Sequence, residues 1–254
     1  MQSLNGDVIG VIYEFLNKCD RKKFLLISND IIFSQAQDFR QLSLPIHWSM
    51  EYVFKSSFRD KCQALVTQQQ RQINLNFRNS AFPLLLDRNS QPCCSLDTLL
   101  HVHTLNLSGC QNLVDVSMLS GISVLNLSHC YRVLDVSSLG NVKDLNLCGC
   151  KELVGVSELG HVKSLNLSGC EWIRSEHVVA LTGVHSLSLN YCQHISDVHL
   201  LGHVHTLELR GCDQIEDVSD LGNVTDLDIS WCWQVTDVSK LGRLRTLKLR
   251  GCAR

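Results

Sequence analysis

The sequence predicts an α/β solenoid in which short coils stack to give a parallel sheet on one side and turns on the other. The first observation is repetition: from Leu99 onward the chain consists of seven full units and one partial unit. The full units are 20 residues long, except the fourth, from Leu159 to Ala180, which has 22. The second observation is that apolar residues occupy the same positions in every unit. No unit can bury its apolar side alone, so the units are expected to stack on their neighbours.

The strand of each coil is predicted from the first unit, in which Leu105 and Leu107 alternate with polar residues. Side chains alternate between the two faces of a strand, so these leucines are expected to point into the core. Thr104, Asn106 and Ser108 would then point outward on a concave face. This layout resembles the leucine-rich repeat, L-x-x-L-x-L-x-x-N/C-x-L. The resemblance implies a horseshoe with a parallel inner sheet and short coils.

The outer face of each coil is expected to consist of turns and single-turn 3-10 helices, because a 20-residue coil leaves little chain for its return path. Asp115, Val116 and Ser117 fit this expectation, since the aspartate and serine can cap backbone groups while the valine enters the core. The longer fourth unit has extra residues around 175–180, and we expect a short true α-helix there.

The two ends of the solenoid need caps. Residues 72–77 alternate like a strand and are predicted to cap the first coil. At the other end the chain stops at Arg254, just past the strand of the last unit, so this coil is expected to be open to edge pairing or fraying. A natural abrupt end, dimerisation and a truncated reading frame all fit this pattern.

Residues 1–45 lack the repeat and are predicted to form two short helices with an amphipathic stripe. Residues 4–28 resemble an F-box, although Asn5 stands where proline is usual, and residues 27–30 lack the basic and tryptophan residues that often close the motif. The resemblance implies docking on the Skp adaptor of a cullin-RING ubiquitin ligase. The adaptor-binding residues would be Leu4, Asp7, Val8, Ile9, Ile12 and Leu16.

A simple helical cap would show a comparable stripe, and this alternative stays open. Residues 46–98 include a stretch at 88–95 that is rich in turn formers, and the whole segment is interpreted as a connector and N-terminal cap without chemistry of its own. The predicted organisation therefore has three parts: an F-box-like helical segment at 1–45, the connector at 46–98 and the leucine-rich repeats at 99–254.

Composition excludes several classes of function. The formal charge of -2 offers no basic field for nucleic acid. No apolar run approaches the roughly 20 residues that span a bilayer, and the first apolar stretch has no basic residue before it, unlike a signal peptide. We expect a soluble cytoplasmic protein with no nucleic-acid or membrane partner. The regular short units also resemble repeat proteins of large amoeba-infecting DNA viruses and of protists, which would imply host or cell cytoplasm.

One cysteine recurs at the same place in every unit. Successive thiols would lie about 4.8 Å apart along a line, so they cannot converge on a metal ion and are held too far apart for disulfides. We predict reduced, buried spacers whose thiols hydrogen-bond the coil backbone weakly. Cys148 differs, because it occupies an outward position. The column comprises Cys110, Cys130, Cys150, Cys170, Cys192, Cys212, Cys232 and Cys252.

Histidines at the start of several coils, such as His203 and His205, repeat a variable surface position, and no acidic partner recurs with them. Zinc binding is therefore not expected. The sequence contains no catalytic triad order, paired-carboxylate motif, P-loop or dinucleotide fingerprint. We predict no enzymatic activity, no cofactor and no metal.

The central column of the concave face changes along the chain. The first four units carry asparagine there, which predicts a ladder of mutually satisfied side chains. Later units replace it, and aromatic and arginine residues appear beside it, a composition typical of protein-binding hot spots. Free drift of an exposed repeat position is the alternative. The predicted partner-binding residues are Asn190, Tyr191, Glu208, Arg210, Asp228, Trp231, Trp233, Lys248 and Arg250.

The sequence therefore predicts a protein-binding adaptor, the substrate-recognition subunit of a Skp-cullin-F-box ubiquitin ligase. The F-box-like helices would dock the Skp adaptor, and the concave face would bind the target protein. The alternative is a ligase-independent repeat scaffold or inhibitor that mediates protein–protein interaction.

Overall fold

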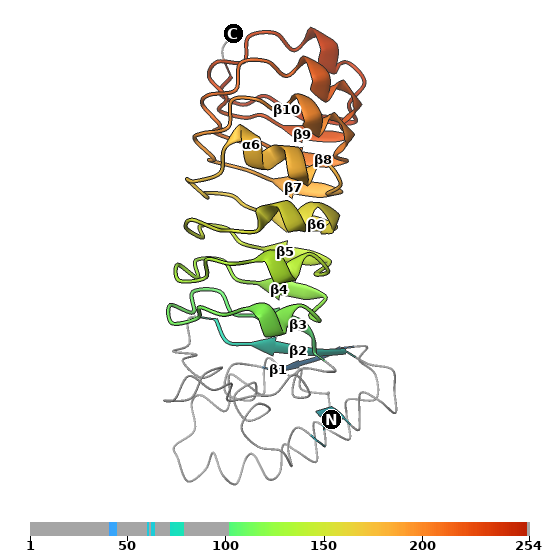
Figure 1. Ribbon diagram of the computed structural model, residues 1–254. Coiled ribbons are helices and arrows are strands. Elements are labelled where there is room, and N and C mark those ends of the chain that lie inside the picture. Colours follow the sequence, from blue (N-terminus) through green and yellow to red (C-terminus); the bar gives the residue numbers. More distant parts are fainter. Residues whose placement is uncertain (1–40, 45–59, 61, 64–71, 79–101, 253–254) are drawn as a thin grey trace, which may run out of the picture. The chain divides into compact units, whose positions relative to one another are not determined.

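Residues 1–40 of the F-box-like segment lie outside the residues that the structure describes, so its two helices and its adaptor-binding side chains stay predictions. This applies to Leu4, Asp7, Val8, Ile9, Ile12 and Leu16. The computed structural model of the protein describes residues 41–44, 60, 62–63, 72–78 and 102–252 (Figure 1).

The chain divides into two compact units, one of residues 1–78 and 84–106 and the other of residues 79–83 and 107–254. The domain boundaries expected from the sequence, after residues 45 and 98, also stay predictions. Each compact unit is described by itself below.

In the described part of the first unit there are three parallel strands that are neighbours in chain order: β1 (Gln41–Leu44), β2 (Gln72–Asn76) and β3 (Val102–Asn106). Strand β2 confirms the strand predicted from alternation. Its apolar residues Ile73 and Leu75 are 0% and 1% exposed, while the polar residues between them face the other side.

The second unit repeats one short strand per coil. The strands lie parallel in chain order and in register, so that each central leucine pairs with the leucine of the next coil (Figure 1). From β4 to β9 this leucine is buried between two half-buried neighbours. The strands are β4 (Val124–Asn126), β5 (Asp144–Asn146), β6 (Ser164–Asn166), β7 (Ser186–Ser188), β8 (Thr206–Glu208), β9 (Asp226–Asp228) and β10 (Thr246–Lys248).

The other side of the second unit carries short helices of one or two turns (Figure 1). Within residues 102–252 an α-helix occurs only in the longer fourth coil, as α6 (Ser175–Val178), which confirms the sequence prediction. The 3-10 helices are η2 (Ser117–Leu119), η3 (Ser137–Leu139), η4 (Val156–His161), η5 (Val179–Leu181), η6 (His199–His203), η7 (Ser219–Asn223) and η8 (Ser239–Leu241).

Aspartates set the geometry of these turns. Asp135 Oδ1 accepts a hydrogen bond from the backbone N–H of Ser137 at 2.9 Å, and Asp217 Oδ1 accepts one from Ser219 at 2.8 Å. These backbone hydrogen bonds hold the pKa of both carboxyl groups below its ordinary value. The aspartate caps predicted from the sequence are therefore confirmed. With one short strand and one helical turn per coil, the second unit is a leucine-rich repeat solenoid.

The cysteine column forms a ladder inside the solenoid. Cys170 Sγ donates a hydrogen bond to the carbonyl oxygen of Leu147 in the preceding coil at 3.3 Å. Six further cysteines make the same contact at 3.0 to 3.3 Å. Burial raises the pKa of the Cys170 thiol to about 12, so this thiol stays neutral at physiological pH. The prediction of buried spacers is confirmed except for Cys252, which is half-buried.

Replacing Cys170 with serine is expected to lower the free energy of unfolding by about 1 kcal/mol or more. The shorter side chain draws the hydroxyl away from the Leu147 carbonyl and leaves a buried polar group poorly bonded. Urea unfolding followed by circular dichroism measures the loss. Cys148→Ser, at a half-buried position, is the matched control and should change stability little. Equal losses at both positions would contradict a stabilising role for the ladder.

Candidate functional site

The asparagine column closes the turn that follows each strand. The Oδ1 atoms of Asn126, Asn146 and Asn166 accept hydrogen bonds at 2.9 to 3.0 Å from backbone N–H groups two residues further on. We expected the asparagine side chains of neighbouring coils to hydrogen-bond to one another as a ladder. This prediction is wrong for these three residues, because their Oδ1 atoms bond to the backbone of their own coil. The chain bends directly after the strand, so the nearest donor is a local N–H group. This column serves the fold more than it serves recognition.

The same bend corrects the prediction for the serines that follow the strand. Ser108 was expected to point outward, yet Ser108 and Ser230 are only 7% and 6% exposed. Strand β3 ends at Asn106, so the residue two places later belongs to the turn and not to the sheet surface. Fewer residues per coil are therefore exposed on the strand face than the sequence pattern predicts.

In each coil, one residue of this turn has a left-handed backbone conformation with positive φ. It stands three residues after the position of the capping asparagine. Glycine is the usual solution, because it lacks the Cβ that makes positive φ costly. In three coils a larger residue takes the position: His129, Tyr191 and Trp231 have φ of 59°, 61° and 64°. The glycines with positive φ at the same place are Gly109, Gly149, Gly169, Gly211 and Gly251.

Each of these larger residues lies over the glycine of the next coil. A Cβ added to Gly211 would come within 2.7 Å of Tyr191 Cδ1, and one added to Gly251 within 2.5 Å of Trp231 Cε3. The aromatic rings therefore fit against the next coil because the glycine there has no side chain. Sequence reasoning did not single out Gly211 and Gly251. The sequence did contain a signal for these contacts: at this position of the repeat, from Tyr191 onward, aromatic residues and glycine alternate from one coil to the next.

Arginines in the following coils complete the arrangement. The Arg210 guanidinium lies 5.9 Å from the ring centre of Tyr191, and that of Arg250 lies 6.0 Å from the ring of Trp231. Trp233 adds a further ring, 5.4 Å from Trp231 and tilted by 60°. We call these residues the aromatic–arginine patch: Tyr191, Arg210, Trp231, Trp233 and Arg250.

The patch is accessible and its cations are not neutralised. Tyr191 is 50% and Trp233 54% exposed, whereas Trp231 is partly covered. Arg210 and Arg250 are both exposed. Among the residues that the structure describes, no carboxylate forms an ion pair with either guanidinium. Five of the nine predicted partner-binding residues thus lie together as a surface with a defined geometry.

Asn190 and Glu208, also predicted to bind a partner, are half-buried and form hydrogen bonds within the chain. Glu208 Oε2 accepts hydrogen bonds at 2.9 Å from Ser188 Oγ and from Asn190 Nδ2. Glu208 stands where earlier coils have the capping asparagine. The N–H of Arg210, which such an asparagine would cap, donates at 2.8 Å to Asn190 Oδ1 of the preceding coil. These two side chains thereby position Arg210.

Asp228 and Lys248 pair with each other. Lys248 Nζ lies 3.4 Å from one carboxylate oxygen of Asp228, and the other oxygen accepts the Ser230 N–H at 3.0 Å, as the capping asparagines do. Partial burial opposes ionisation of Asp228, but the hydrogen bonds from Ser230 and the charge of Lys248 outweigh it, so the pKa lies below its ordinary value. Asp228 therefore acts as a turn cap, and Lys248 acts as its counter-ion.

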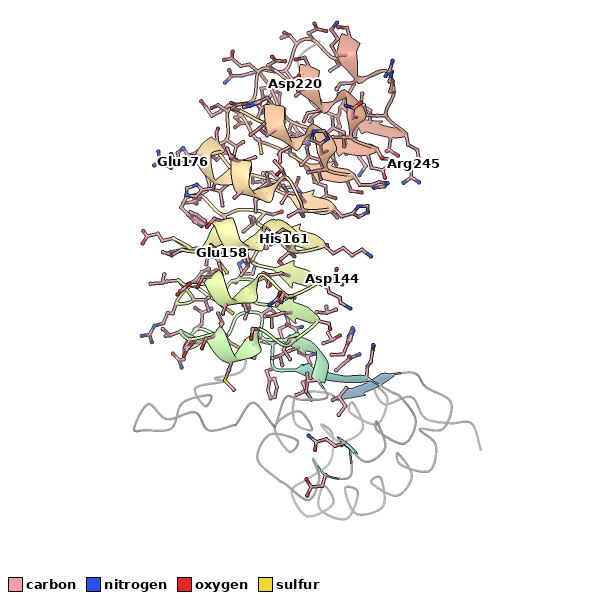
Figure 2. The ribbon with its side chains drawn as sticks, turned by 45° about the vertical axis from the view of Figure 1, so that its right-hand side comes forward. Asp144, Glu158, His161, Glu176, Asp220 and Arg245 are labelled. Carbon is pink, nitrogen blue, oxygen red and sulfur yellow. The ribbon has the colours of Figure 1, made fainter. Side chains whose placement is uncertain are left out.

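A second ion pair marks the strand side of the last coils. Arg245 Nη2 lies 2.6 Å from Asp226 Oδ2. Figure 2 shows Arg245 on this side of the unit and Glu176 on the side of the short helices. Further along this side His185 and His205 stack with ring centres 4.5 Å apart.

In the described ranges, no group of three or more His, Cys, Asp or Glu residues is placed to hold a metal ion. Nor does any helix in those ranges have the length and apolar character that crossing a membrane requires.

Comparison with known proteins gives likeness at the level of structure alone. No protein-family model and no curated protein matches the chain. An internalin, InlF, from Listeria monocytogenes shares 22% identity at a TM-score of 0.49, covering 64% of this chain and 58% of the internalin. The functional domain of InlJ from the same bacterium, which includes a cysteine ladder, shares 12% identity at a TM-score of 0.41, covering 71% and 48%. The chain spans about half the length of these solved structures.

Proposed function

We propose that this chain is a protein-binding repeat module and that the aromatic–arginine patch is where it holds its partner. One observation carries the proposal: two exposed arginines, each over an aromatic ring and neither paired with a carboxylate among the described residues, lie on one surface of a stacked solenoid. Stacked coils provide a rigid extended surface, and tyrosine, tryptophan and arginine are the residues that dominate the energy of protein interfaces.

Random drift of exposed repeat positions accounts less well for this surface. A left-handed backbone at tyrosine or tryptophan is costly, and such strain persists where the surroundings enforce it. Tyr191 and Trp231 both take this conformation, and the next coil has glycine under each ring. The ring-over-glycine pair also occurs at His129 and Gly149, outside the patch, so this stacking belongs to the fold. What distinguishes the two places in the patch is the arginine that precedes each glycine and lies over the ring.

The test is affinity purification with mass spectrometry from an extract of the organism that makes the protein. The intact chain is compared with a variant in which residues of the patch are replaced by alanine. A partner recovered by the intact chain and lost by the variant supports the proposal. Recovery of the same partners by both proteins would contradict it.

A finer form of the proposal makes the chain a substrate-recognition subunit of a Skp-cullin-F-box ubiquitin ligase. It is supported by the F-box-like pattern of residues 4–28 together with the repeats. The alternative is a ligase-independent scaffold or inhibitor, which would use the repeats alone.

Replacing Ile9 and Ile12 with aspartate is expected to abolish binding to a purified Skp adaptor, because charges would interrupt the apolar stripe that docks the adaptor. A pull-down with the intact chain measures this. Val114→Asp, at an exposed apolar position of the repeats, is the matched control and should retain binding. Failure of the unmodified chain to bind the adaptor would exclude the ligase role and leave the scaffold.

A further inference from the structure

The aromatic–arginine patch contains two equivalent pairs, each of an aromatic ring and an arginine. Tyr191 with Arg210, and Trp231 with Arg250, make the same contact at 5.9 and 6.0 Å. Each arginine directly precedes the glycine that lies beneath the ring. The two pairs therefore occupy equivalent places, two coils apart, in turns that follow strands in register. At about 4.8 Å per coil, the backbone positions of the two arginines are separated by roughly 10 Å along the stack, and both side chains make the same contact with a ring.

The charges around the two pairs favour an anionic partner. Two neighbouring carboxylates are paired with cations of the chain, Asp228 with Lys248 and Asp226 with Arg245. Glu208 keeps its charge and is held by neutral donors of Ser188 and Asn190. The two guanidinium groups of the patch have no such carboxylate partner among the described residues. An arginine held against a ring keeps its N–H donors free at the edge of its plane, where a carboxylate binds in bidentate fashion.

The spacing of the two arginines selects the conformation of the partner. In a polyproline II segment, residues three apart lie on the same side and are about 9.3 Å apart. In a β-strand, residues on one face are separated by about 6.7 or 13 Å, which does not match. A polyproline II segment also has no internal hydrogen bonds and docks on aromatic surfaces, which Tyr191, Trp231 and Trp233 provide here.

Given the proposed function, we infer that the patch binds an acidic segment of a partner protein in polyproline II conformation, with a carboxylate at every third residue. One carboxylate meets Arg210 and the next meets Arg250. The backbone between them lies along the rings of Tyr191 and Trp231.

The test uses a fluorescein-labelled peptide of repeated Glu-Pro-Pro triplets and measures its fluorescence anisotropy with the full chain. The wild-type chain is expected to bind it and to ignore the same peptide with glutamine in place of glutamate. Arg210→Gln with Arg250→Gln should weaken binding roughly tenfold or more, the loss expected for a charged hydrogen-bonded contact. Lys143→Gln with Lys163→Gln removes the same charge from exposed positions elsewhere on the strand side and should leave binding unchanged.

Three results would overturn the inference: no binding of the Glu-Pro-Pro peptide, an equal loss in the lysine variant, or tighter binding of a helical peptide with glutamates seven residues apart. The first two mean that the arginines are not a paired carboxylate site, and the third assigns them a helical partner. The proposed function is judged separately. If the patch variant loses its cellular partner while the peptide does not bind, only the partner chemistry is wrong.

Discussion

Trp231→Ala combined with Arg210→Ala is expected to abolish capture of the partner while leaving the far-UV circular dichroism spectrum unchanged. The two substitutions remove one ring and one cation, each from a different pair, so neither pair stays complete. Truncating a central aromatic or arginine anchor of an interface typically costs about 2 kcal/mol or more, so losing two such anchors weakens binding roughly a thousandfold, which takes a micromolar complex out of the range of capture. Capture by the immobilised chain, quantified by mass spectrometry, measures the effect.

The fold should survive because these side chains lie outside the core. The leucines of the adjoining strands, Leu207 and Leu227, are 0% and 1% exposed and are not altered. Alanine at position 231 keeps the left-handed backbone that the wild-type residue already adopts, so the substitution adds little strain there. The unfolding midpoint is therefore expected to stay close to that of the wild-type chain.

A matched control is available at the other end of the repeats. Lys151 lies 5.3 Å over the ring of Tyr131, which is an aromatic–cation pair outside the patch. Tyr131→Ala with Lys151→Ala removes the same kinds of groups and should leave capture intact. Equal losses from the two double variants would mean that the partner does not distinguish the patch from the rest of the surface.

The parts of this structure that were predictable from sequence depend on a residue's own chemistry at a repeated position. A leucine such as Leu165 or a cysteine such as Cys170 has the same surroundings in every coil, because each coil has nearly the same neighbours. The repeated strands, the turn aspartates, the short helix of the fourth coil and the cysteine ladder were correctly predicted for this reason.

The parts that could not be predicted depend on relations between neighbouring coils. Asn190 caps the N–H of Arg210 only because Glu208 has replaced the residue that would otherwise do so. Gly211 is required by the ring of Tyr191, which lies 20 positions earlier in the chain. A column read one residue at a time does not reveal such pairs, because each member looks like ordinary variation.

Gly211→Ala is expected to destabilise the protein more than Gly169→Ala, although both glycines have a φ of 68°. Each substitution incurs the cost of a left-handed alanine, about 1–2 kcal/mol. At Gly169 the nearest atom to a new Cβ is the backbone nitrogen of Gly149 at 4.0 Å, so nothing further is lost. At Gly211 the Cβ would meet Tyr191 Cδ1 at 2.7 Å, and displacing the ring adds a cost of about 1 kcal/mol or more. Urea unfolding midpoints compare the two variants.

A double-mutant cycle with Tyr191→Ala isolates the contribution of the ring. When the ring is absent, Gly211→Ala should cost no more than Gly169→Ala does, which gives a coupling between positions 191 and 211. Purely additive effects would show that the ring does not require the glycine. The same variants also test the patch, because Gly211 is buried and cannot touch a partner. If Gly211→Ala reduces capture and Gly169→Ala does not, the loss is transmitted through the displaced Tyr191, and the orientation of the aromatic–arginine pairs is then itself a determinant of binding.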